Sequence, residues 1–306
     1  MAAGGGTKAI LAALFANAGI AVSKFIGFLI TGSSSMLAES VHSVADTSNQ
    51  GLLLLGMKTS QRKATKNHPF GFGRDRYFYS FIVALVLFTL GSAFAIYEAI
   101  HKMQHPEDLT SPIVAVVILV VAIVLETFSF RTAIVESRKV KGDAGWWQFI
   151  RQSRTPELPV VLLEDAGALF GLIFALFGVG LAVITGDAVW DGIGTLMIGI
   201  LLGVIAIILI IEMKSLLIGE GATPREFDAI DTALVGGRVE RLIHIKTQYV
   251  GPDELLVAAK IALAPGLPLA DVATEINDAE ARIRAAVPAA RLIYLEPDLD
   301  RTRSAT

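Results

Sequence analysis

The sequence predicts an α-helical membrane protein with six transmembrane helices and a small α+β domain at its C-terminal end. Three observations support this prediction. Of the 306 residues, 53% are hydrophobic, and they are gathered in runs of about 20 residues, the length that crosses a bilayer as a helix. Basic residues concentrate in every second connection between these runs. Beyond Lys214 the long apolar runs stop and charged residues recur at short intervals.

The long apolar runs define the predicted membrane helices. They cover residues 10–30, 36–57, 77–100, 113–135, 158–185 and 190–213. The first run has no clear small-residue cleavage site after it, so we interpret it as a membrane helix and not as a removable signal peptide. We therefore predict a transmembrane domain over residues 1–213 and a cytoplasmic domain over residues 214–306.

The distribution of positive charge predicts the orientation. The two basic connections follow the second and the fourth run, and their residues are Lys58, Arg62, Lys63, Lys66, Arg74 and Arg76, then Arg138, Lys139, Lys141, Arg151 and Arg154. Because positive loops stay on the cytoplasmic side, we expect both termini in the cytoplasm. The membrane we expect is the bacterial inner membrane.

The C-terminal region has the pattern of a compact domain. A helix, two strands joined by the turn Gly251-Pro252-Asp253, a second helix and a final strand are predicted at residues 224–234, 239–250, 254–264, 269–287 and 291–296. The order αββαβ predicts a sheet with helices on one face. So small a domain also favours support from a second copy, as in a homodimer.

Composition excludes several classes of function. A formal net charge of −3 gives no indication of a nucleic-acid partner. The absence of Cys excludes disulfides, Cys-ligated zinc and iron–sulfur clusters. We expect no prosthetic group.

The second apolar run contains a polar stripe. Glu39, His42, Asp46 and Asn49 follow one another at i, i+3, i+7 and i+10 and so share one helical face. Ionisable groups at membrane depth cost roughly 2.5–3.5 kcal/mol each and therefore face the bundle interior or water. His42 and Asp46, one turn apart, can bind a metal from one face, and the imidazole favours Zn. Proton and metal compete for the imidazole lone pair.

Two adjacent carboxylates, Glu164 and Asp165, interrupt the fifth run. Adjacent helical residues diverge by about 100°, so one of them is free to face the second helix. The alternative is that both are solvated charges at the cytoplasmic helix end. If one meets His42 and Asp46, the ligands suffice for a tetrahedral divalent site. A further acid, Glu126, lies midway along the fourth run. Either neighbouring helices donate hydrogen bonds to its carboxyl group, or it relays protons.

The segments His42-Ser-Val-Ala-Asp46, His68-Pro-Phe-Gly-Phe-Gly-Arg74 and Gly219-Glu-Gly-Ala-Thr-Pro224 together resemble the cation diffusion facilitator family. The version around His42 is similar to the branch that includes a mitochondrial zinc transporter of animals. The resemblance implies a homodimer of six-helix subunits that exports Zn or a similar ion in exchange for protons. It also implies a ferredoxin-like C-terminal domain.

The resemblance assigns the transport site to His42, Asp46 and Asp165. Val161 stands where the family usually has a His, so we expect Glu164 to supply the missing metal ligand. The family's accessory cytoplasmic metal site matches at His244 and, more weakly, at Glu296, and we expect that site to be mostly lost. The family also pairs a basic residue at the position of Arg74 with an acidic one at that of Glu220.

We predict a divalent metal exporter and not an enzyme. The substrates are then a divalent metal, Zn first, and protons, and the surroundings are a lipid bilayer. The alternatives are a membrane-embedded metal-dependent enzyme and a membrane anchor whose soluble domain binds a partner protein. The enzyme alternative lacks a metalloprotease HExxH helix and a nucleophile motif, and the anchor leaves the polar stripe unexplained.

Overall fold

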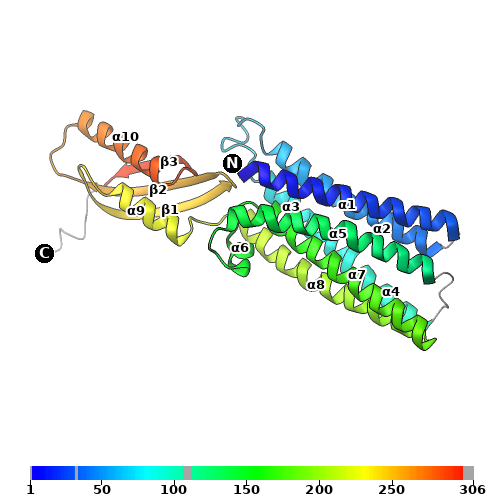
Figure 1. Cartoon of the computed structure of the whole chain (residues 1–306). Helices are drawn as coiled ribbons and strands as arrows, with labels where there is room; N and C mark the ends of the chain where they lie inside the picture. Colours follow the sequence, from blue (N-terminus) through cyan, green and yellow to red (C-terminus); the bar gives the residue numbers. More distant parts are fainter. Residues whose placement is uncertain (1, 32–33, 106–111, 299–306) are drawn as a thin grey trace. The chain divides into compact units, whose positions relative to one another are not determined.

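The computed structural model describes residues 2–31, 34–105 and 112–298 (Figure 1). Two compact units are present. One runs to Thr59 and resumes over Asp75–Lys214, and the other combines Ser60–Arg74 with the chain from Ser215 onward. The loop Ser60–Arg74 therefore belongs with the C-terminal part of the chain, although it connects two helices of the first unit.

The first unit is a bundle of helices. They are α1 (Ala2–Thr31), α2 (Ser34–Thr59), α3 (Asp75–Val86), α4 (Phe94–Gln104), α5 (Pro112–Lys141), α6 (Trp146–Gln152), α7 (Glu157–Thr185) and α8 (Val189–Ile218). Helix α1 packs against α2 and α5, and α5 packs against α7 (Figure 1). The polar stripe predicted from the sequence lies on α2, and the adjacent carboxylates lie on α7.

Five helical stretches in the described residues are long and apolar enough to cross a membrane. These are Gly6–Ile30, Asp75–Gln104, Ile113–Lys141, Glu157–Thr185 and Val189–Ile218. Helix α2 is not among them, since its polar stripe lowers its hydropathy. Their outward-facing side chains include exposed Phe15, Phe128 and Ile184, as expected where lipid replaces water.

The third predicted span is one helix with an internal irregularity. A π-helical segment, η1 (Leu87–Ala93), joins α3 to α4, and periodicity did not predict it. The hydroxyl of Ser92 in η1 donates to the carbonyl of Gly199 on α8 at 2.8 Å. The short helix α6 was also not predicted, because seven residues are too few for a periodic signal.

The second unit contains the sheet. Its elements are α9 (Pro224–Leu234), β1 (Val239–Gly251), β2 (Glu254–Leu263), α10 (Leu269–Ala286) and β3 (Ala290–Pro297). Strands β1 and β2 are antiparallel, β2 and β3 are parallel, and the order in the sheet is β1-β2-β3. The predicted order αββαβ is confirmed. Helix α9 begins with a capping box in which Thr223 and Glu226 satisfy each other's backbone donors.

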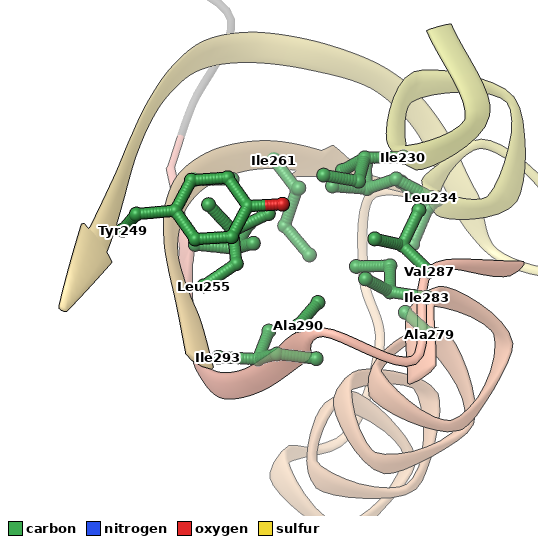
Figure 2. Close-up of a cluster of buried hydrophobic side chains, with 13 residues drawn as sticks. Ile230, Leu234, Tyr249, Leu255, Ile261, Ala279, Ile283, Val287, Ala290 and Ile293 are labelled. Carbon is green, nitrogen blue, oxygen red and sulfur yellow. The ribbon is translucent and has the colours of Figure 1, made fainter. Parts of the chain in front are cut away.

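One face of the sheet and both helices form a single core. Alternate residues of β2, among them Leu255 and Ile261, are fully buried in it, as strand periodicity requires. Figure 2 shows these side chains meeting Ile230 of α9 and Ile283 of α10. The loop Ser60–Arg74 approaches the β1–β2 turn so closely that a Cβ on Gly73 would lie 2.8 Å from the Cα of Gly251.

Candidate metal site

The predicted ligands lie on two helices of the bundle, His42 and Asp46 on α2 and Glu164 and Asp165 on α7. The side chains of Glu39 and His42 lie outside the described residues. Asp46 is half-buried. Glu164 and Asp165 are 7% and 1% exposed, which excludes the alternative in which both are solvated at the helix end.

Glu164 joins α7 to α2. Nδ2 of Asn49 donates to its Oε1 at 3.2 Å, and Nε2 of Gln50 donates to its Oε2 at 2.9 Å. Asn49 belongs to the predicted stripe, so the stripe faces α7 at that residue. Both carboxylate oxygens of Glu164 accept from neutral amide donors, so a metal bound through either oxygen would share that oxygen with a hydrogen bond or replace it.

Asp165 faces the neighbouring helix α5. The hydroxyl of Ser129 donates to Oδ2 of Asp165 at 2.6 Å, and both residues are 1% exposed. The two adjacent carboxylates of α7 therefore diverge as helical geometry demands, Glu164 toward α2 and Asp165 toward α5.

A third carboxylate belongs to the same region. Glu126 on α5 is 1% exposed, and it interacts electrostatically with Asp165, Glu164 and Asp46. The sequence predicted an acid at this depth but not its neighbours, so Glu126 was missing from the predicted ligands. Its place one turn before Ser129 on α5 is the signal that relates it to α7.

The arrangement is an acidic seam between α2, α5 and α7. Among the described side chains, no three His, Cys, Asp or Glu residues are already placed to hold a metal ion. Ser129 donates a hydrogen bond to Asp165, whereas Asn49 and Gln50 donate to Glu164, so the two carboxylates have different partners. Chemically, this seam is a buried, oxygen-rich group of carboxyl side chains, the kind of ligand that binds a divalent cation.

The described residues of the second unit contain no group of three possible metal ligands. His244 and Glu296 line the same shallow hollow on the sheet, but Glu296 forms an ion pair with Lys260 at 3.1 Å. Hydrogen bonds from Lys260 to Asp298 and then to Glu296 raise the pKa of Lys260. The pairing of Arg74 with Glu220 stays a prediction.

Comparison with known proteins identifies the family. The family model for the cation efflux transmembrane domain matches residues 10–218. The chain belongs to the cation efflux family. The resemblance to cation diffusion facilitators is thereby confirmed, and so is the prediction of a transporter family and not an enzyme family. A metal is the substrate in such a family, and no prosthetic group is indicated.

Individual relatives agree with this assignment. The chain is 34% identical to a mitochondrial proton-coupled zinc antiporter, SLC30A9, of Xenopus laevis over 83% of this chain and 46% of that protein. It is 29% identical to metal tolerance protein C4 of Arabidopsis thaliana over 83% of this chain and 56% of that protein. It is 34% identical to the zinc transporter ZitB of Pectobacterium atrosepticum over 39% of this chain and 36% of that protein. The chain spans about half the length of the SLC30A9 relatives.

Proposed function

We propose that this protein exports a divalent metal cation, Zn in the first place, in exchange for protons. The observation that supports this most directly is the acidic seam between α2, α5 and α7 inside an apolar bundle. Membership of the cation efflux family and the names of the zinc-transporting relatives support the same function. Proton exchange is supported by one of those names, proton-coupled zinc antiporter, and by the competition of metal and proton for His42.

The transport site that we propose lies between α2 and α7 and uses His42, Asp46 and Asp165, with Glu164 as a further ligand. Glu164 would bind the metal through an oxygen that accepts from Asn49 or Gln50 in the absence of metal. One nitrogen among several oxygens still favours Zn over Mg or Ca.

The architecture that we propose has six spans, because α2 must cross the membrane if its stripe is to meet α7 at depth. We further propose that residues 1–213 form the membrane domain and residues 214–306 a cytoplasmic ferredoxin-like domain. Both termini would then lie in the cytoplasm, and the working form would be a homodimer. The bacterial inner membrane remains the expected location.

Ion flux into proteoliposomes tests the proposal. The full chain is reconstituted, and uptake of Zn, Mn, Fe and Co is measured with and without a pH gradient. We expect Zn uptake that rises when the gradient drives protons in the opposite direction. Absence of flux for all four metals would overturn the metal-transport proposal, and flux indifferent to the gradient would overturn proton exchange alone.

A further inference from the structure

We propose that Glu126 on α5 is a ligand of the transported divalent cation, which makes the site a three-helix site formed by α2, α5 and α7. This inference rests on the proposed function and names one more residue of its site. Nothing in the family match or in the relatives' names assigns a role to this residue.

The first step is the direction of the side chain. Glu126 and Ser129 are three residues apart on α5 and so lie on the same face of that helix. Ser129 contacts Asp165 of α7 through its 2.6 Å hydrogen bond. The face of α5 that presents Glu126 is therefore the face that packs against the carboxylates of α7, in agreement with their electrostatic interaction.

The second step is the state of the carboxylate. Oε2 of Glu126 is buried and accepts no hydrogen bond from any described group. Buried polar atoms are almost always paired, and a buried acceptor without a donor costs about 1–3 kcal/mol. Glu126 interacts electrostatically with Glu164 and Asp165, and this oxygen has no described hydrogen-bond donor, so it is available to coordinate a cation.

The third step is the charge of the cluster. The described hydrogen bonds to Glu164 and Asp165 come from the neutral donors Asn49, Gln50 and Ser129. Within the described residues, no Lys or Arg forms an ion pair with Glu126, Glu164 or Asp165. Other buried acids of the bundle do have such a partner, as Glu157 has Arg76. A buried carboxyl group without a basic partner is either protonated or coordinates a metal, so a divalent cation that displaces protons matches this cluster.

The fourth step concerns the hydrogen bonds that each carboxylate already makes. Both oxygens of Glu164 are engaged by α2, whereas Asp165 has one oxygen on Ser129. Glu126 is thus the carboxylate that needs to give up the fewest contacts to bind a cation next to Asp165. A cation drawn to Glu126 and Asp165 would be held between α5 and α7, and the α2 ligands would complete the site.

The experiment uses the purified full chain in detergent and measures equilibrium binding of Zn²⁺ and Mn²⁺. Glu126→Gln keeps the shape of the side chain and removes the charge. Glu126→His offers a nitrogen ligand at the same place. Glu136→Gln is the matched control, since Glu136 is also a buried acid of α5 but is paired with Lys139 at 2.5 Å. Asp165→Asn reports on the proposed function.

We expect Glu126→Gln to weaken Zn²⁺ binding by about 10-fold or more, the scale on which metal sites respond to lost supporting groups. Glu126→His should bind Zn²⁺ and raise the preference for Zn²⁺ over Mn²⁺, because a nitrogen replaces a hard oxygen. Glu136→Gln should bind as the wild type does.

An unchanged Zn²⁺ affinity in Glu126→Gln, with Asp165→Asn impaired, would overturn the role of Glu126 and leave the proposed function intact. An unchanged Zn²⁺/Mn²⁺ ratio in Glu126→His would also overturn it, and this ratio decides alone if Glu126→Gln does not fold. A wild-type protein that binds neither metal would overturn the proposed function and this inference together.

Discussion

The hydroxyl of Ser129 on α5 lies 2.6 Å from Oδ2 of Asp165 on α7, and both side chains are buried. This hydrogen bond fixes the direction of one of the two adjacent carboxylates of α7. The other, Glu164, accepts from Asn49 and Gln50 of α2, so three hydrogen bonds set the geometry of the seam before any cation binds.

We predict that Ser129→Ala weakens Zn²⁺ binding by about 10-fold, because a group that orients a metal ligand typically contributes 10- to 100-fold. Ser129→Thr, which keeps the hydroxyl, should restore most of the affinity. Thr132→Ala is the control, since that hydroxyl on the same helix donates only to the carbonyl of Phe128 within α5. Binding isotherms on the purified variants measure this, and equal affinities for Ser129→Ala and Thr132→Ala would contradict it.

The second prediction concerns the charges of the proposed site. Asp46→Ala and Asp165→Ala should each abolish Zn²⁺ flux into proteoliposomes while the protein still purifies as the wild type does. Each change removes an anionic ligand from a low-dielectric region where the metal has few other partners.

Asp143→Ala is the control for these two variants. Asp143 is exposed in the connection between α5 and α6, so its removal should leave flux unchanged. Normal flux in both site variants would contradict the proposed site and would place the metal-binding residues elsewhere in the bundle.

Patterns within short segments were enough to predict most of the elements. Strand alternation, the Gly251-Pro252-Asp253 turn and the helical spacing after residue 269 are local signals, and the five C-terminal elements lie within a few residues of their predicted bounds. The apolar runs likewise mark the long helices, although helices such as α5 continue beyond the apolar run into charged residues.

A pattern within one helix does not show which residues of other helices its side chains will contact. The adjacency of Glu164 and Asp165 showed that they diverge, but only the packing of α7 decides that Glu164 meets Asn49 and that Asp165 meets Ser129. Glu126 was missed as a site residue for the same reason. Sequence periodicity also did not predict the π-helical segment η1, because it assumes a constant number of residues per turn.

The third prediction concerns a buried ion pair between α3 and α7. The guanidinium of Arg76 contacts both carboxylate oxygens of Glu157 at 2.5 and 2.7 Å, and both side chains are buried. Removing one partner of such a pair leaves a buried charge and costs about 3–5 kcal/mol. We therefore predict that Glu157→Gln lowers the unfolding temperature clearly, and that Arg76→Met combined with Glu157→Leu recovers part of the loss.

The comparison variant for this pair is Asp191→Asn. It breaks the ion pair of Lys102 with Asp191, whose side chains are 33% and 18% exposed, and a more solvated pair contributes about 1 kcal/mol or less. Thermal unfolding followed by the loss of the folded species on size exclusion measures both. A smaller loss in Glu157→Gln than in Asp191→Asn would refute the argument.

The fourth prediction is the oligomeric state. One face of the C-terminal sheet is covered by α9 and α10, and the opposite face includes exposed Tyr294 of β3. We expect a homodimer, and so a protein mass of twice 32.6 kDa in detergent after correction for the bound micelle. Light scattering at micromolar protein checks this, and a monomer throughout would count against it.

The last prediction tests the packing of α7 on α8, where two glycines face each other. A Cβ on Gly178 would lie 2.9 Å from the carbonyl oxygen of Trp190 and 3.2 Å from the Cα of Gly194. Small residues allow membrane helices to approach this closely, and a methyl group has no space there.

Gly178→Ala should destabilise the bundle by about 1–3 kcal/mol, the usual cost of overpacking. Gly180 is the matched control, because it lies two residues further along α7 with nothing within 4 Å of its added Cβ. Gly180→Ala should be neutral or slightly stabilising, since Ala is the better helix former. Thermal unfolding of the two variants in the same detergent decides the matter: equal midpoints would mean that the close approach of α7 and α8 at Gly178 contributes nothing to the fold.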